Sequence, residues 1–342
     1  MKLNRMCLKM TDEIKPFVVS YEEDGQRLDK WINFHFNHVS KIMMEKLCRT
    51  GQIRVNSSRV KPNFKLIENQ IIRIPNFIRK KDQKNDKFLT NKKEQLFNKI
   101  KKSIVYEDNY FFIFNKPFGL AVQGGSKLGP NHLDGILPFF SERDYPIPKL
   151  VHRLDKDTSG ILVVAKTPKS ASAFSKLMIE RRIKKSYWAL VNEPIKYKTG
   201  ILYTPQKDES VLKKNIIYKY NLNKDYLNAK FFFLEAEDKE MISTYKKLKI
   251  INENVSLLNL FAVTGRKHQL RKQLAAIGYP IIGDKKYTKK SQLVTDNSKE
   301  KLQLHARGII FQNPISGKLI NVKCPPPVHM KKFLHVDEIN QF

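Results

Sequence analysis

The sequence has few cysteines and no long apolar run. Only three of its 342 residues are cysteines, Cys7, Cys48 and Cys324, and they lie far apart. Their odd number and wide spacing exclude a disulfide framework and a zinc site of the usual ligand spacing. No run of about 18 apolar residues is present, which excludes a membrane-spanning helix. The first residues also lack the apolar core of a secretion signal, so we expect a cytoplasmic protein.

The motifs of several cofactor and metal enzymes are missing as well. The stretch QGGSKLGP lacks the spacing of a phosphate-binding loop, and no Gly-x-Gly-x-x-Gly follows a predicted strand. There is no Gly-x-Ser-x-Gly turn to present a nucleophilic serine. His35 and His38 come without further ligands at metal-site spacing. The sequence therefore predicts neither a cofactor nor a metal, and its chemistry has to come from side chains.

Acidic residues are few compared with basic ones. The chain has 64 Lys and Arg against 33 Asp and Glu, a formal net charge of +31. Part of this excess fits a drift of composition, because Lys, Asn and Ile are common throughout. The functional interpretation of the positive charge is that the protein binds a polyanion. Nucleic acid, bound through its phosphates, is the most plausible partner. A membrane surface fits less well, because no basic amphipathic segment is evident.

The pattern along the chain predicts two folded domains. Residues 18–78 are expected to form a small domain of two helices followed by short strands, and residues 79–102 a basic linker. Residues 103–335 are rich in strands that do not alternate regularly with helices. We therefore expect an α+β fold with a mixed, mainly antiparallel sheet. The basic side chains of the small domain favour RNA binding over the alternative of a merely solvated face.

Local signals place individual elements. Leu28, Trp31 and Ile32 have helical spacing, and Ser40 and Thr167 are each typical of the residue that caps a helix start. GILVVAKT and AKFFFLEAE predict strands, the first of them buried. RGIIFQNPISGKLINVKCP predicts a hairpin, because a Pro and a Gly interrupt two apolar runs.

Ionisable residues crowd the start of HRLDKDTSGILVVAKT, which begins at His152. An Asp before a Thr-Ser-Gly turn is often structural, because its side chain accepts hydrogen bonds from the turn backbone. This stretch carries two, Asp155 and Asp157, although the turn needs only one. Arg153 lies nearby and an apolar run follows. A carboxylate in such surroundings is suited to act as a preorganised nucleophile or base.

A second cluster lies in TGRKHQLRKQLAAIG, and a tyrosine begins the strand predicted in KKSYWALV. His268 and Arg271 are expected to share one face of a helix, opposite its leucine stripe. They are either surface groups or part of a convergent site in which Arg271 pairs with Asp155. Tyr187 is either a packing residue or, if it faces a pocket, a platform for a flipped or single-stranded base.

These motifs resemble, in content and order, those of the pseudouridine synthases that modify large-subunit ribosomal RNA. HRLDKDTSGILVVAKT resembles the family signature. The other matching stretches are FNKPFGLAVQGGS, KKSYWALV, TGRKHQLRKQLAAIGYPIIGDKKY and LHARGIIFQNPISGKLINVKCPPP, within roughly Ile104 to Phe333. VQGGS is most similar to the C-type branch. The small leading domain resembles an RNA-binding domain first described in a small-subunit ribosomal protein.

The resemblance implies isomerisation of specific uridines to pseudouridine in 23S-type ribosomal RNA, without a cofactor. Separately from the resemblance, we expect a monomer. The resemblance implies that Asp155 is the catalytic carboxylate near the ribose C1′. Tyr187 would pack on the uracil, and Arg271 would pair with Asp155 and keep it ionised.

It also implies supporting roles for four residues. Arg153 would hold the place of the flipped-out uridine, Arg266 would brace its loop, Asp157 would be structural, and His268 would support the site. The chain departs from the family pattern at three positions. Lys272 and Gln273 replace a Val-His pair and Thr288 replaces a Gly, which puts in doubt details of RNA contact and loop shape.

Two other functions are compatible with parts of the sequence. A ribosome assembly factor that binds RNA without catalysis is one, although the set Asp155, Tyr187 and Arg271 is complete. A nucleoside glycosidase is the other, because Asp155 and Asp157 could serve as acid and base. A net charge of +31 suits a free nucleoside poorly.

Overall fold

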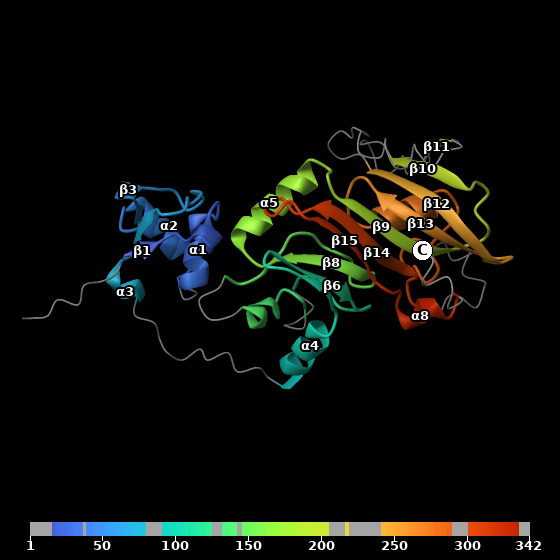
Figure 1. Cartoon of the computed structure of the whole chain (residues 1–342), viewed down its shortest axis with the longest axis horizontal. Coiled ribbons are helices and arrows are strands. Elements are labelled where there is room, and N and C mark those ends of the chain that lie inside the picture. Colours follow the sequence, from blue (N-terminus) through green and yellow to red (C-terminus); the bar gives the residue numbers. More distant parts are fainter. Residues whose placement is uncertain are drawn as a thin grey trace, which may run out of the picture. The chain divides into compact units, whose positions relative to one another are not determined.

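A computed structural model describes residues 16–36, 39–79, 91–124, 132–141, 146–204, 216–218, 241–288 and 300–334. The chain divides into two compact units, Met1–Phe88 and Leu89–Phe342 (Figure 1). Cys7, His38 and the strand predicted in AKFFFLEAE lie outside the described residues. Among the helices of the described ranges, none has the length and apolar character that crossing a bilayer requires.

The first unit contains the predicted two helices followed by short strands, with a further short strand before the helices and a short helix after the strands. Its elements are β1 (Phe17–Val18), a 3₁₀ turn (Tyr21–Glu23), α1 (Leu28–His35), α2 (Lys41–Arg49), β2 (Arg54–Val55), β3 (Ser58–Arg59), β4 (Ile71–Arg73) and α3 (Asn76–Arg79). The strands form one antiparallel sheet in the order β1-β4-β2-β3. Leu28, Trp31 and Ile32 are buried in the core. Ser40 caps α2, because its hydroxyl accepts a hydrogen bond from the Met43 amide.

The described part of the second unit is built on an 11-stranded sheet. Its strands are β5 (Ile104–Glu107), β6 (Phe111–Lys116), β7 (Lys149–Leu150), β8 (Ser159–Ala165), β9 (Lys184–Asn192), β10 (Thr199–Thr204), β11 (Ile216–Tyr218), β12 (Met241–Asn252), β13 (Val255–Ala262), β14 (Leu304–Gln312) and β15 (Leu319–Lys323). The order is β11-β10-β12-β13-β9-β14-β8-β6-β5, with β15 on β14 and β7 on β8. Strand β14 pairs with β8 in parallel, and the other described pairs are antiparallel. The predicted α+β fold with a mixed, mainly antiparallel sheet is confirmed.

The described part of the second unit also contains short helices. They are α4 (Asn91–Lys101), a 3₁₀ turn (Leu137–Phe140), α5 (Pro168–Ile179), α7 (Gln269–Ala276) and α8 (Val328–Lys331). Thr167 caps α5 as predicted, since its hydroxyl accepts from the Ser170 amide. Helix α4 lies in the segment interpreted as a basic linker. Ile100 of this helix is nevertheless buried and belongs to the second unit's core, against which Leu96 also packs.

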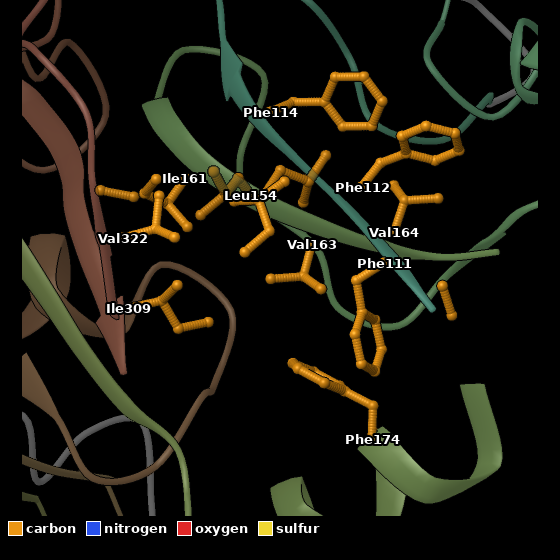
Figure 2. Close-up of a cluster of buried hydrophobic side chains, with 14 of the residues drawn as sticks. Phe111, Phe112, Phe114, Leu154, Ile161, Val163, Val164, Phe174, Ile309 and Val322 are labelled. Atoms are coloured by element: carbon orange, nitrogen blue, oxygen red, sulfur yellow. The ribbon is translucent and has the colours of Figure 1, made fainter. Parts of the chain in front are cut away.

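Strand β8 lies within the main hydrophobic core, next to the residues that will form the site. All seven of its residues are buried, in agreement with the prediction for GILVVAKT. Phe111, Phe174 and Phe311 meet nearby with ring centroids 5.2–5.6 Å apart, and Figure 2 shows the first two. This packing fixes β8, and therefore the turn that precedes it.

Gly160 is the position in β8 that we expect to tolerate substitution least. It has a φ of +107°, and a Cβ there would lie 2.2 Å from the carbonyl oxygen of Ala306 on β14. Gly160→Ala should therefore lower the free energy of unfolding by about 3 kcal/mol or more, through backbone strain and overlap together. Gly317 has a φ of +72° and open space around it, so Gly317→Ala should cost only about 1–2 kcal/mol. Urea unfolding measures both, and equal losses would contradict this explanation.

Candidate active site

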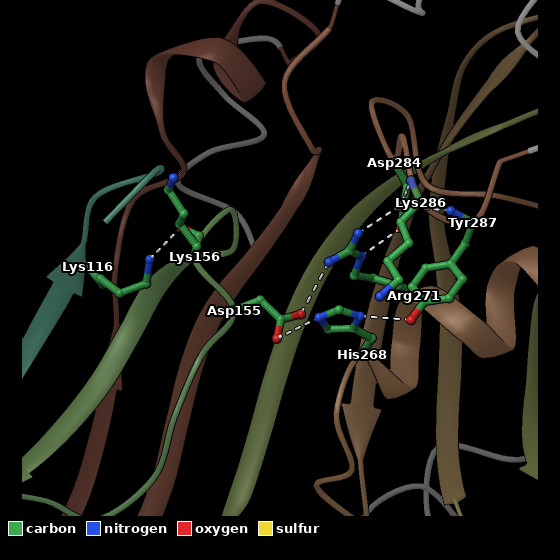
Figure 3. Close-up of polar contacts among 8 residues, drawn as sticks. All are labelled: Lys116, Asp155, Lys156, His268, Arg271, Asp284, Lys286 and Tyr287. Atoms are coloured by element: carbon green, nitrogen blue, oxygen red, sulfur yellow. Dashed lines mark hydrogen bonds and ion pairs between the residues drawn. The ribbon is translucent and has the colours of Figure 1, made fainter. Parts of the chain in front are cut away.

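The turn that carries Asp155 and the start of α7 meet in the second unit (Figure 3). Asp155 lies in the turn that leads into β8, and Arg271 lies in the first turn of α7. One Arg271 nitrogen, Nη1, is 3.5 Å from Asp155 Oδ2, and His268 Nε2 is 3.4 Å from Asp155 Oδ1. The structure thus contains the Arg271–Asp155 pair that the sequence suggested. It also brings His268 to the same carboxylate.

Arg271 is held mainly by a residue that the sequence interpretation did not single out. Its Nε and Nη2 donate to the two carboxylate oxygens of Asp284 at 2.7 and 2.8 Å. Both side chains are buried. Burial works against the charge of Arg271, but the hydrogen bonds and charge of Asp284, assisted by Asp155, raise its pKa above the usual value. Asp284 therefore fixes the guanidinium and leaves Nη1 to face Asp155.

His268 does not share a helix face with Arg271, so this prediction was wrong. It is the residue before α7 and has a left-handed backbone with φ +55°, which places its ring beside the helix start. Its Nδ1 lies 2.8 Å from the Tyr287 hydroxyl. Burial lowers the pKa of His268, Asp155 opposes this, and the cations Arg271, Lys286 and Lys267 lower it further. The imidazole is therefore biased towards its neutral form.

Tyr187 and Asp155 line the same cavity, which has a volume of about 290 Å³. Tyr187 lies on β9, and burial, with the charge of Asp155, raises the pKa of its hydroxyl to about 12. Arg153 and Arg266 also line this cavity, and both side chains are exposed. The volume is at the lower end of the range for small-ligand sites and suits one nucleoside. Of the predicted site residues, all six border this cavity.

Arg266 closes its loop through the backbone. Its amide donates to Gln269 Oε1 at 3.0 Å, and its carbonyl accepts from the Gln269 amide. Gln269 is buried and also bonds Thr264, so it fastens the turn before α7. Its side chain was missed in the sequence, where a glutamine at a helix start carries no distinctive signal.

Asp157, expected to be structural, has an exposed side chain. It borders a second cavity of about 610 Å³ that adjoins the first and shares Asp155, His268 and Arg271 with it. Exposed lysines line this second cavity and make it basic. They are Lys156, Lys267, Lys285, Lys286 and Lys301.

A buried lysine supports the turn that carries Asp155. Lys116 is 1% exposed, and its Nζ donates to the carbonyl oxygens of Pro117, Leu120 and Lys156 at 3.1, 2.9 and 3.1 Å. Burial lowers its pKa to about 7, and the charges of Asp157 and Asp155 oppose the shift. Lys116 therefore ties the residues after β6 to the Asp155 turn, a long-range contact that no local pattern indicates.

The replacement of a family histidine by Gln273 has a structural consequence. Gln273 is buried, and its Nε2 donates to the carbonyl oxygens of Leu202 and Met241 at 3.0 and 2.9 Å. It thereby fastens α7 to the ends of β10 and β12. Because the Gln273 side chain is inside the protein, this departure from the family pattern changes internal packing.

The site contains the groups for carboxylate chemistry on one nucleoside. Asp155 lies between the Arg271 guanidinium and the His268 imidazole, at the wall of a cavity that the Tyr187 ring also lines. Within the described ranges, no group of three or more His, Cys, Asp or Glu side chains is placed to hold a metal ion.

Comparisons with known proteins identify the class. A family model described as RNA pseudouridylate synthase matches residues 110–276. The ribosomal large subunit pseudouridine synthase C of Buchnera aphidicola subsp. Acyrthosiphon pisum (strain APS) is 33% identical over 335 residues, covering 95% of this chain and 99% of that protein. The protein of the same name from Pasteurella multocida (strain Pm70) is 31% identical over 323 residues, with 94% and 93% covered.

A solved structure agrees in fold. Human RNA pseudouridylate synthase domain containing 4 superposes with a TM-score of 0.55 at 23% identity, covering 71% of this chain and 97% of that one. Fold and sequence together define an isomerase that acts on RNA. The chain belongs to the RNA pseudouridylate synthase family, which confirms the resemblance noted in its motifs.

Proposed function

We propose that this enzyme converts specific uridines of large-subunit ribosomal RNA to pseudouridine, with Asp155 as its catalytic carboxylate. One observation carries the assignment of the site. Asp155 borders a cavity of nucleoside size together with Tyr187, while Arg271 and His268 approach its two oxygens at 3.5 and 3.4 Å. The relatives named for the ribosomal large subunit support the choice of RNA.

The reaction rearranges atoms without adding or removing any from the nucleotide as a whole. The N1–C1′ bond breaks, the uracil turns, and C5 bonds to C1′. C5 then loses its proton and N1 gains one. In this proposal the Asp155 carboxylate acts at C1′, and the Arg271 guanidinium, 3.5 Å away, lies opposite its negative charge. Tyr187 supports the uracil face, and Arg153 takes the position that the flipped base leaves in the RNA.

The lysine-lined second cavity suits the phosphates next to the flipped uridine. Lys156, Lys267 and Lys286 border this cavity beside Asp155, so nucleotides on either side of the target would contact cations. Such contacts bind without reading base sequence. We further propose a monomer that acts in the cytoplasm on ribosomal RNA. In this proposal residues 18–78 bind RNA, residues 79–90 link the two units, and α4 together with residues 103–335 forms the catalytic unit.

Purified protein incubated with unmodified ribosomal RNA tests the proposal. Pseudouridine should accumulate while no free uracil appears. Uracil release would favour the glycosidase, and RNA binding without either product would favour the assembly factor. The glycosidase has little structural support, because its second carboxylate, Asp157, borders the lysine-lined cavity instead of the nucleoside-sized one.

Removing Met1–Phe88 is expected to weaken RNA binding by about tenfold or more at physiological salt and to reduce the salt dependence of binding. The cut follows the boundary between the compact units and keeps α4, whose Ile100 belongs to the second core. Filter binding at several salt concentrations measures the loss, and thermal unfolding checks that the second unit still folds. A truncated protein with full-length affinity would contradict RNA binding by the first unit.

A further inference from the structure

The backbone at His268 has an unfavourable conformation that determines where the imidazole ring lies. Its φ of +55° and ψ of 25° are left-handed, a region that residues with a Cβ seldom adopt. Such backbone persists where the surroundings impose it, often at functional sites. Here it puts the imidazole between the Asp155 carboxylate and the Tyr287 hydroxyl (Figure 3).

The two nitrogens of the His268 imidazole face different groups, Tyr287 at Nδ1 and Asp155 at Nε2. A neutral imidazole has one N–H, and its other nitrogen accepts. Burial keeps His268 biased towards the neutral form. Tyr287 Oη lies 2.8 Å from Nδ1 and can donate its proton there, which leaves the N–H on Nε2. That nitrogen is the one that faces Asp155 Oδ1 at 3.4 Å.

Each oxygen of Asp155 is therefore faced by a different group, and both groups are held from one loop. Arg271 faces Oδ2 and is fixed by Asp284. His268 faces Oδ1 and contacts Tyr287, which lies only three positions after Asp284. The Tyr287 amide also donates to Asp284 Oδ1 at 3.2 Å, so the two supports are joined.

We propose that Tyr287 and His268 are positioning residues for the reaction: Tyr287 fixes the imidazole tautomer whose Nε2–H orients the Asp155 carboxylate towards the ribose. The inference rests on the proposed function, in which Asp155 is the catalytic group. His268 would thus be a second residue that holds the Asp155 carboxylate, besides the arginine that the family motif implies. Second supports of this kind fix the tautomer and orientation of the group they contact.

Tyr287→Phe removes the hydroxyl and keeps the ring, which lies 5.7 Å from the His268 ring and 5.3 Å from the Arg271 guanidinium carbon. His268→Asn removes the imidazole but keeps a residue that tolerates the left-handed backbone, whereas His268→Ala also strains the backbone. We expect Tyr287→Phe and His268→Asn each to lower kcat on ribosomal RNA by about tenfold, the scale of second-shell losses. KM should stay within about twofold, and His268→Ala should additionally lower the unfolding temperature.

Titration of His268, followed by NMR of labelled histidine, gives a readout that does not depend on activity. The groups that face its ring are Asp155, Arg271, Lys267, Lys286 and Tyr287. Tyr287→Phe removes the donor to Nδ1 and should raise the pKa of His268, because the free lone pair protonates more easily. Asp155→Asn removes the charge that favours protonation and should lower it. The signal of His35, in the other compact unit, should not move.

The outcomes separate this inference from the proposed function. Opposite shifts of the His268 pKa, with lower kcat in Tyr287→Phe and His268→Asn, support it. The inference would be overturned, even if the wild-type protein makes pseudouridine, by a wild-type kcat in both variants. It would also be overturned by a His268 pKa that is the same in Tyr287→Phe as in the wild type. Wild-type protein that makes none would overturn the proposed function and the positioning role together, whereas the titration would still report the hydrogen bond.

Discussion

Asp155→Asn is expected to lower the rate of pseudouridine formation by at least about 10³-fold, the scale seen when a catalytic nucleophile or base is removed. The substitution keeps the size of the side chain and removes its charge. Asp155 is partly exposed at the wall of its cavity, so the fold should tolerate the change. Affinity for ribosomal RNA should stay within about twofold, because phosphate contacts elsewhere supply most of the binding.

Asp157→Asn is the matched control, since it makes the same chemical change two positions away. Asp157 is exposed and acts through its charge on Lys116. Its substitution should change the rate by no more than about threefold, the scale of an exposed charge. Single-turnover assays compare the two variants. Asp155→Asn activity within about tenfold of wild type, or an Asp157→Asn loss of the same size, would contradict the assignment of Asp155.

Asp284→Ala should have the second-largest effect, on stability and activity alike. Asp284 is 2% exposed and Arg271 8%, and removing Asp284 leaves the buried Arg271 charge opposite the more distant carboxylate of Asp155, 3.5 Å away. Such losses amount to about 3–5 kcal/mol of unfolding free energy. Urea unfolding measures this loss. Conversion should also fall by about tenfold or more under conditions where the variant is folded, because Arg271 is no longer held against Asp155.

A double variant separates the two effects. Combining Asp284→Ala with Arg271→Met removes the buried charge, so part of the stability should return. Activity should not return, because Asp155 has lost its arginine. An Asp284→Ala protein that loses less than about 1 kcal/mol, or a double variant with wild-type activity, would contradict the role of this ion pair.

The local elements of this fold could be predicted because their signals lie close together in the sequence. Thr167 and Pro168 start α5 through a side chain that bonds three residues away. The apolar run Ser159–Ala165 is buried along its whole length. Helix α4 shows the limit of such signals. Its many lysines obscured the few apolar residues by which it joins the second core.

Only those residues of the candidate site could be predicted whose own side chains are expected to act on the substrate and that lie in recognisable motifs. Asp155, Tyr187 and Arg271 stand in recognisable stretches, and the structure places them around one cavity. Asp284 and Lys116 act by holding other groups, 13 positions away at Arg271 and 40 positions away at Lys156. These spacings exceed the reach of a helix or strand period, so the sequence pattern does not reveal the contacts. The left-handed backbone of His268 was also invisible in the sequence, because its neighbours predicted a helix that begins one residue too early.

A map of pseudouridine across ribosomal RNA tests the central claim most directly. It should be made in cells that carry the wild-type gene, no gene, or the Asp155→Asn variant. The account predicts that one or more large-subunit positions lose pseudouridine without the gene, regain it with the wild type and stay uridine with the variant. A map that is the same in all three would contradict the claim that this chain modifies large-subunit ribosomal RNA through Asp155.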